Sequence, residues 1–364
     1  MNSETEIPTP KINPQSSNQK HFNRLKVLGA LFTLFGIGLF AYFIYRVGFY
    51  EIVAGVGKIG FAGFAVVLFV YFLRICVRGI AWKLSVYEPY KLDLKDTIPA
   101  VIIGEAMSSM IPLGILVSGT SKAVAVKHRV PLVVGLSSIA TENLFYSLVT
   151  SIFIILGAVS FLRTFELDQG WIITIDVLIA AIICLIFFGF LMVLRQWHFA
   201  SAICEKLYKR GFATSILETG RLHVRLFENL IYGFYRRYPK RFLPIFLLQI
   251  VFHALGVFEA WFILSRLSEA FPSLFTAFLL ESFSRLINVV FKLIPFLVGV
   301  DEAGSQFVTE TMAIGAGIGV SLAIIRKGRV LFWTAIGLIF IIKCGFSFKD
   351  IAEAHRQKPE FASK

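Results

Sequence analysis

The sequence predicts an all-α integral membrane protein with about seven or eight transmembrane helices and no soluble domain. Its composition is the first reason: 57% of the 364 residues are hydrophobic and 15% are aromatic, far from the average of soluble domains. The second reason is that apolar runs long enough to cross a bilayer recur from end to end. The third is that Lys and Arg gather at the ends of these runs, as they do in bilayer proteins.

The expected helices follow from the apolar runs in chain order. They are 25–45, 61–82, 131–162, 171–194, 242–264, 271–291, 305–325 and 330–346. Residues 1–24 are rich in Ser, Asn, Pro and Gln, so we expect a disordered tail without a signal peptide, and a first helix that stays in the mature protein. The chain then divides into a first membrane half (25–195), a basic linker (196–241), a second membrane half (242–347) and a C-terminal tail (348–364).

The basic residues predict how the chain is oriented. The segment from Arg195 to Arg241 holds ten Lys/Arg against three Glu, whereas 163–170 holds one Arg against two acids. By the positive-inside rule, the linker and the N-terminus are cytoplasmic and the protein is a multi-pass protein of the cell membrane. The net charge of +13 therefore does not indicate a nucleic-acid partner. The linker is either an ordinary loop or a pair of amphipathic helices facing anionic lipid head groups.

The C-terminal side does not fit this rule. Arg326–Arg329 and the tail after Lys343 are both basic, yet they flank one expected crossing. Either one of them lies outside or a helix is miscounted, and we favour a cytoplasmic tail.

Two segments are predicted to be broken or re-entrant, with helix breaks at Pro112 and Gly119 and at Pro295 and Gly299. A non-helical backbone survives at membrane depth only where it lines protein or water, so two half-helices that enter and leave on the same side are the simplest shape. Pro112 precedes Glu142 by 30 residues and Pro295 precedes Arg326 by 31. This spacing is either chance or the sign of two repeats, each giving one discontinuous helix to a central site.

Charged residues inside apolar runs are the candidate binding residues, because an ionisable group at membrane depth is costly unless it faces a cavity or a partner. The predicted substrate-binding set is Arg74, Arg78, Lys122, Glu142, Asp301, Glu302 and Arg326.

Four of these residues also have a structural explanation. Arg74 and Arg78 share a helix face and either hold a phosphate or carboxylate or extend to the head groups. Asp301 and Glu302 either cap a helix or face a cavity with Arg326 and Arg74. Glu281 and Arg285 can simply pair with each other.

Other classes of chemistry lack a motif. The sequence contains no Walker, GxGxxG, HExxH, GxSxG or DxD pattern, and its four cysteines are scattered. We predict no catalytic residue, no metal and no cofactor.

Four stretches together resemble one family. "LRICVRGIAWKL", "IPLGILVSGTSKA", "VPLVVGLSSIATENLF" and "IPFLVGVDEAG…SLAIIRKGR" are similar to successive signatures of the transmembrane region of lysylphosphatidylglycerol synthases and their stand-alone, flippase-like relatives. The resemblance covers about 60–347. The aminoacyl transfer of the long members belongs to a separate soluble C-terminal domain, and this chain ends about 18 residues after its last expected helix. The resemblance therefore implies that it is not an aminoacyl-lipid synthase.

The resemblance also implies site residues. Arg78 with Trp82 matches the family's Arg and aromatic residue, and Glu142 matches the acid of its "ER" pair. Pro295, Gly299 and Glu302 match a P…G…E motif, and Arg326 matches a later Arg. The chain departs from the family at "PLGILVSGTSK", where Thr120 stands in place of a Glu and Lys122 falls one position short of the last Arg of P-x-R-x-G-E-x-x-R. That departure puts the usual head-group specificity in doubt.

The leading functional prediction is a lipid translocase that moves a polar-headed lipid, a phospholipid or a polyprenyl-phosphate-linked lipid, between leaflets. One alternative is a membrane transferase that acts on such a lipid. The other is a non-catalytic partner of a lipid-biosynthesis enzyme, and a homo-oligomer is also compatible with the sequence.

Overall fold

The computed structural model describes residues 49–343, apart from gaps at 111–113, 167, 197, 210–213, 269–271, 292–296 and 298. Within that part all regular structure is helical, as predicted. The helices are α2 (Phe49–Leu84), α3 (Leu94–Met110), α4 (Gly114–Ala125), α5 (Leu132–Thr164), α6 (Gln169–Arg195), α7 (Phe199–Lys209), α8 (Thr214–Arg237), η1 (Pro239–Arg241), α9 (Phe242–Leu267), α10 (Leu274–Val290), α11 (Val300–Thr311) and α12 (Ala316–Lys343). The expected tail 1–24, the expected span 25–45, Pro112, Pro295 and the tail 348–364 lie outside the described residues.

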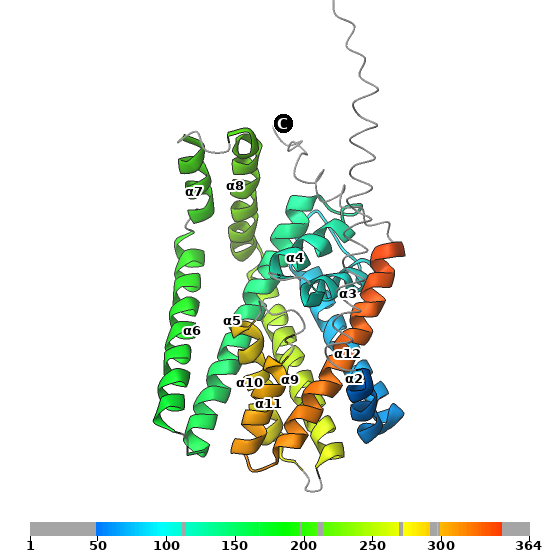
Figure 1. Cartoon of the computed structure of the whole chain (residues 1–364). Helices are drawn as coiled ribbons and strands as arrows, with labels where there is room; N and C mark the ends of the chain where they lie inside the picture. Colours follow the sequence, from blue (N-terminus) through cyan, green and yellow to red (C-terminus); the bar gives the residue numbers. More distant parts are fainter. Residues whose placement is uncertain are drawn as a thin grey trace, which may run out of the picture.

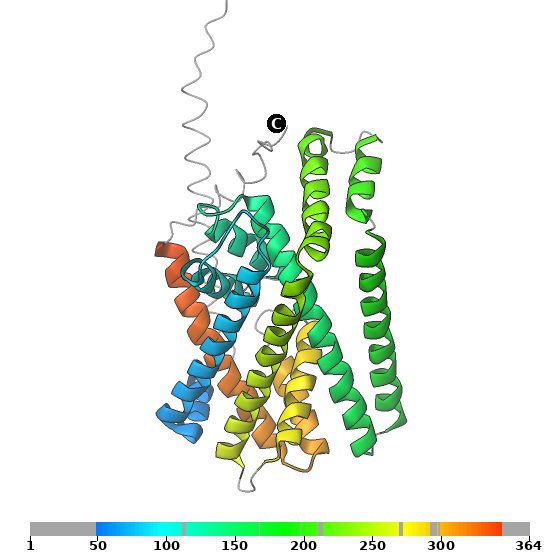
Figure 2. The ribbon, with the colours of Figure 1, turned by 180° about the vertical axis from the view of Figure 1, so that it is seen from behind.

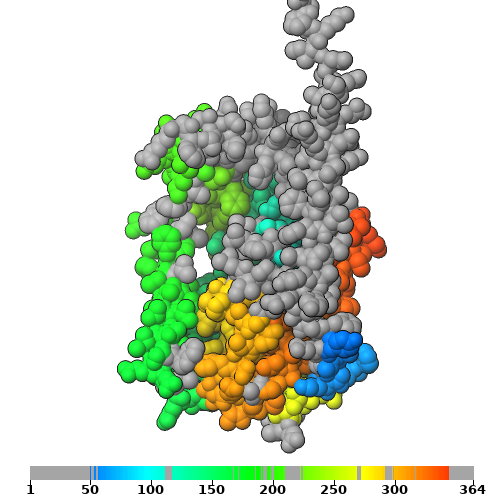
Figure 3. Space-filling view, viewed as in Figure 1, coloured from blue at the N-terminus to red at the C-terminus, as the bar shows by residue number. Residues whose placement is uncertain are grey.

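Four of the described helices contain segments long and apolar enough to cross a membrane. They are Val56–Leu84, Leu132–Thr164, Ile172–Gly189 and Pro239–Leu267, in α2, α5, α6 and α9. These segments overlap the predicted runs 61–82, 131–162, 171–194 and 242–264. A helix suits such a run because it satisfies every backbone hydrogen bond internally and can turn apolar side chains outward to lipid. Helix α6 is the most lipid-exposed example, because it packs on α5 at the side of the bundle (Figure 3). Its Val177 and Phe187 side chains are exposed.

The same order of helix lengths occurs twice. Helices α2 to α5 have 36, 17, 12 and 33 residues, and α9 to α12 have 26, 17, 12 and 28. The two short helices pack together in each series, α3 with α4 and α10 with α11. Figures 1 and 2 show the α3–α4 pair at one end of the bundle and the α10–α11 pair at the other. Each half thus contains a pair of short helices between two long ones.

The prediction of separate spans at 305–325 and 330–346 is wrong. Helix α11 ends at Thr311, Gly315 has a left-handed φ of 114°, and α12 then runs unbroken from Ala316 to Lys343. The basic stretch Arg326–Arg329 therefore lies in the middle of one helix. Because its three cations are buried against protein acids, the helix can continue through them without exposing charge to lipid. One helix was miscounted, and Arg326–Arg329 is not a loop between two crossings.

The predicted break at Gly119 is also wrong, whereas Gly299 does lie at a helix start. Gly119 is inside α4, where an isolated glycine is tolerated, and a Cβ there would lie 3.8 Å from Ile139 on α5. Gly299 is the N-cap of α11 and has φ of 84°, a conformation that an L side chain adopts only with strain.

The described part of the linker is a helical hairpin. Helices α7 and α8 pack side by side and extend past the end of the bundle that holds α3 and α4 (Figure 1). His198, directly before α7, hydrogen-bonds with Asn229 of α8 at 2.8 Å. Arg241 then fixes the start of α9 to the loop after α2, because it donates to the carbonyl of Val86 at 3.0 Å and pairs with Glu88.

Candidate functional site

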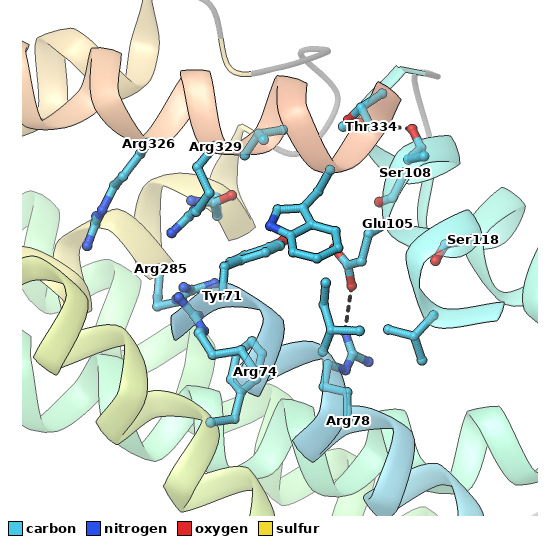
Figure 4. A pocket seen from close by; sticks show the side chains of 18 of the residues that line it. Tyr71, Arg74, Arg78, Glu105, Ser108, Ser118, Arg285, Arg326, Arg329 and Thr334 are labelled. Atoms are coloured by element: carbon cyan, nitrogen blue, oxygen red, sulfur yellow. Dashed lines mark hydrogen bonds and ion pairs between the residues drawn. The ribbon is translucent and has the colours of Figure 1, made fainter. Parts of the chain in front are cut away.

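A cavity of about 370 Å³ lies inside the bundle, where the two pairs of short helices approach the long ones (Figure 4). This volume is within the usual range for small-molecule sites. Its charged lining is mostly basic: Arg74, Arg78, Lys122, Arg285, Arg326, Lys327 and Arg329, against Glu105 and Asp301. A lining of this kind suits an anion rather than a metal cation.

The first group of ion pairs is centred on Glu281 of α10, which is fully buried. Its carboxylate accepts from Arg285 at 2.8 Å, from Arg326 at 2.6 Å and from Arg74 at 3.5 Å. These arginines come from α10, α12 and α2, so one acid joins three helices. The close approach depends on Gly256 of α9, where a Cβ would collide with the Glu281 carboxylate.

Glu259 of α9 is the second buried acid, with 1% exposure. It pairs with Arg329, lies 3.5 Å from Arg74 and lies 3.9 Å from Arg326. Neither Glu259 nor Glu281 lines the cavity, so both acids lie behind arginines that do. Four arginines against these two glutamates and Asp301, which also faces Arg326 and Arg329, leave one positive charge in excess at this end of the cavity. Buried charges of one sign are retained only where partners or a ligand compensate them.

A third buried acid, Glu142 of α5, holds Arg78 of α2. The Arg78 guanidinium donates to Glu142 at 2.9 and 3.2 Å, to Asn143 at 3.0 Å and to Glu105 at 3.2 Å. Gln249 of α9 completes the group by donating to Glu142 at 3.0 Å. Helices α2, α3, α5 and α9 are thus joined around one arginine.

The two adjacent acids at the start of α11 have different surroundings. Glu302 accepts from the backbone N–H of Gly299 at 2.9 Å, which caps α11, and it also pairs with Lys327 of α12. Asp301 is 8% exposed and lines the cavity. Glu302 therefore holds the helix start in place, while Asp301 is in position to meet a ligand.

Several donors around the cavity have no hydrogen-bond partner in the described part of the chain. They are the buried Nε atoms of Arg74, Arg326 and Arg329 and the indole Nε1 of Trp333. The faces of two of these guanidinium groups are covered, because Arg74 lies 4.2 Å from the Phe252 ring centroid and Arg329 lies 4.3 Å from that of Tyr71. A buried donor without a partner is costly. These four atoms are themselves buried, so they are not the groups that a ligand in the cavity would contact.

The structure brings most of the predicted binding residues together. Five of the seven line the cavity, namely Arg74, Arg78, Lys122, Asp301 and Arg326. Glu142 and Glu302 do not line it, but each pairs with a cation that does. Whether these residues bind a substrate is still a prediction.

Sequence reasoning missed other members of the site. Lys327 and Arg329 lie between the two expected spans 305–325 and 330–346 and are not in the predicted set. Glu259 is not in it either, although it is an acid in the middle of an apolar run. Arg285 was assigned to Glu281 alone, yet it both pairs with Glu281 and lines the cavity. An inventory of every charge inside an apolar run would have found Glu259.

The family model for the lysylphosphatidylglycerol synthase TM region matches residues 26–337. The chain belongs to that family. The match includes both pairs of short helices and every charged residue of the cavity, so this member of the lysylphosphatidylglycerol synthase TM family is a multi-pass membrane protein, as its apolar helices indicate. No curated protein and no solved structure matches the chain.

Proposed function

We propose that the protein is a lipid translocase, which moves a lipid with a phosphate-bearing head group between membrane leaflets through the cavity between its two halves. The observation that carries the proposal is the cavity itself. Seven basic residues line it against two acids, inside a bundle whose outer surface is apolar. A polar head group can cross a bilayer only if it finds polar partners at depth, and such a cavity supplies them.

The arrangement of the short helices supports transport rather than storage of a lipid. The α3–α4 and α10–α11 pairs lie at opposite ends of the bundle, each between two long helices (Figures 1 and 2). We interpret them as re-entrant pairs in two repeats, the architecture in which many transporters open a central site to alternate sides. In this proposal the protein is in the cell membrane, and the basic α7–α8 hairpin is cytoplasmic, where its cations meet anionic lipid head groups.

The test is lipid movement in proteoliposomes. The purified protein is reconstituted with a fluorescent phospholipid, and dithionite is added to bleach the label exposed in the outer leaflet. We expect bleaching beyond the outer-leaflet half with wild-type protein. Replacing Arg285 by Gln should slow the exchange about tenfold, the loss of roughly one charged hydrogen bond to the head group. Arg285 is the variant of choice because Glu281 keeps Arg74 and Arg326 as partners.

The matched control is Arg266→Gln on α9. Arg266 is exposed, stacks on Phe262 and does not line the cavity, so its replacement should leave the exchange rate unchanged. Bleaching that stops at one half with wild-type protein contradicts the translocase. An equal effect of Arg266→Gln and Arg285→Gln would contradict the assignment of the cavity as the route.

A further inference from the structure

Asp176 is an exception among the charged residues inside the apolar helices. It lies in the segment of α6 that is long and apolar enough to cross a membrane. Its side chain is exposed, and its carboxylate makes no hydrogen bond or ion pair with any residue that the structure describes. Charges inside α2, α5 and α9 are paired instead, Arg74 with Glu259 and Arg78 with Glu142. An acid at membrane depth is costly without a partner, and the described residues do not supply one to Asp176.

Asp176 lies well inside α6. The helix begins at Gln169, seven residues earlier, which is about 10 Å along the helix axis at 1.5 Å per residue. Lysine and arginine can extend a long stem along a helix to reach the head groups, whereas aspartate has a single methylene group. Two other acids, Glu166 and Asp168, precede the helix and are exposed there. The carboxylate of Asp176 is therefore in the apolar part of α6 rather than at its polar end.

Asp176 belongs to an exposed outer face of α6. Ile175 is buried and packs in the hydrophobic core, which fixes the inner face of the helix. The outer face carries a stripe of exposed residues at the spacing i, i+4, i+7 and i+11, namely Asp176, Ala180, Ile183 and Phe187. Figures 1 and 2 show α6 at the side of the bundle. The same spacing forms the seam between packed helices, and a small residue such as Ala180 lets a second transmembrane backbone come close to the acid.

The acid determines which partner fits this face. Lipid chains offer neither charge nor hydrogen-bond donors at this depth, so lipid alone leaves the carboxylate uncompensated. A closed two-fold contact between two copies of this face would place two Asp176 side chains against each other, and like charges repel. A transmembrane helix with a Lys or Arg at the depth of Asp176 supplies the opposite charge, and ionisable residues inside membranes usually pair in this way.

We infer that the outer face of α6 docks a transmembrane helix of another membrane protein, one that carries a Lys or Arg opposite Asp176. The ion pair sets the depth at which the two helices meet, and Ala180, Ile183 and Phe187 supply the apolar contact. The inference does not depend on the proposed function, since none of these four residues lines the central cavity.

The test measures association with synthetic transmembrane helices. The purified full-length protein, labelled with a donor dye at its N-terminus, is reconstituted with peptides of Leu and Ala that carry an acceptor dye. One peptide has a single Arg about 10 Å inside its apolar run, the depth of Asp176, and the other has Leu at that position. We expect energy transfer to show that the Arg peptide binds about tenfold more tightly than the Leu peptide, the contribution of roughly one charged hydrogen bond.

Two variants of Asp176 assign the effect to this residue. Asp176→Asn keeps the size of the side chain and should remove the preference for the Arg peptide. Asp176→Lys should reverse the preference, so that a peptide with Asp at the same position binds about tenfold more tightly than the Arg peptide. The matched control is Asp168→Asn, because Asp168 is an exposed acid that precedes α6, so its replacement should leave the preference unchanged.

Three results with the peptides would overturn the inference. They are equal binding of the Arg and Leu peptides to the wild-type protein, an unchanged preference after Asp176→Asn, and an equal effect of Asp168→Asn. Energy transfer between two differently labelled copies of the protein that is lost in Asp176→Asn would assign the face to a second copy and would also overturn it. If Asp176→Lys does not fold, Asp176→Ala is the second variant, and it should lose the preference for the Arg peptide as Asp176→Asn does.

Discussion

Replacing Glu281 by Gln tests whether the buried ion pairs hold the bundle together. Glu281 is fully buried, and its carboxylate accepts from Arg74, Arg285 and Arg326 at 3.5, 2.8 and 2.6 Å. The variant keeps the size of the side chain but removes its charge, and it places an NH₂ donor among three guanidinium groups. Three arginines then share a buried site with one negative charge fewer.

The expected loss is large because no water reaches this position. Removing one partner of a buried ion pair costs about 3–5 kcal/mol in the free energy of unfolding, since the remaining charge is left buried without compensation. Here three cations lose one partner, so we expect the upper part of that range. The measurement is equilibrium unfolding in mixed micelles with a rising fraction of sodium dodecyl sulfate, followed by tryptophan fluorescence.

Glu310→Gln on α11 is the matched control. Glu310 is exposed and accepts from Gln306 four residues earlier, at 3.0 Å, so the same change of chemistry should shift the free energy of unfolding by about 0.5 kcal/mol or less. A loss for Glu281→Gln no larger than that of the control would refute the reasoning. In that case the arginines would be compensated by something other than this carboxylate.

Three further changes test how the site is positioned, and each uses the same unfolding assay. Gly256→Ala should lower the free energy of unfolding by about 1–3 kcal/mol, because the added methyl group collides with the Glu281 carboxylate. Gly189→Ala on α6 is the control, and it should not lower this free energy because a methyl group there meets open space. Gly299→Ala should lower the free energy of unfolding by about 1–2 kcal/mol, because Gly299 has φ of 84° at the start of α11 and alanine adopts such a φ only with strain. An unchanged free energy of unfolding would argue against that conformation. Glu302→Gln and Lys327→Gln should each lower the free energy of unfolding, because the two side chains pair. The double variant should lose less than the sum of the two single losses, with a coupling energy of about 0.5–3 kcal/mol. Strictly additive losses would show that the two side chains do not interact.

The sequence alone determined the class of the protein. Apolar runs of bilayer length can be satisfied only as helices, because lipid offers no hydrogen bonds to an open backbone, and α2, α5, α6 and α9 follow those runs. The same argument marked the charges inside the runs as exceptional, and five of the seven residues chosen on that basis line one cavity. The family followed from short motifs along the chain, and the family model agrees.

The sequence pattern within one segment led to a wrong prediction where the partners of its charged residues lie far away in the sequence. Arg326–Arg329 looks like a loop between two crossings until Glu281, Glu259 and Glu302 are found beside its cations. Nothing within α12 reveals those partners, because they lie on α9, α10 and α11. For the same reason a run of apolar residues around a basic centre was divided into two helices.

Only the tertiary structure decided whether each charged residue lines the cavity or pairs with another residue of the protein. Asp301 and Glu302 are adjacent in sequence and both carry a carboxylate, yet one lines the cavity and the other caps its own helix and pairs with Lys327. Glu142 was expected to meet a substrate, and the fold places it behind Arg78. The physical reason is that the energy of a buried charge depends on its nearest partners in space, and those partners come from other helices.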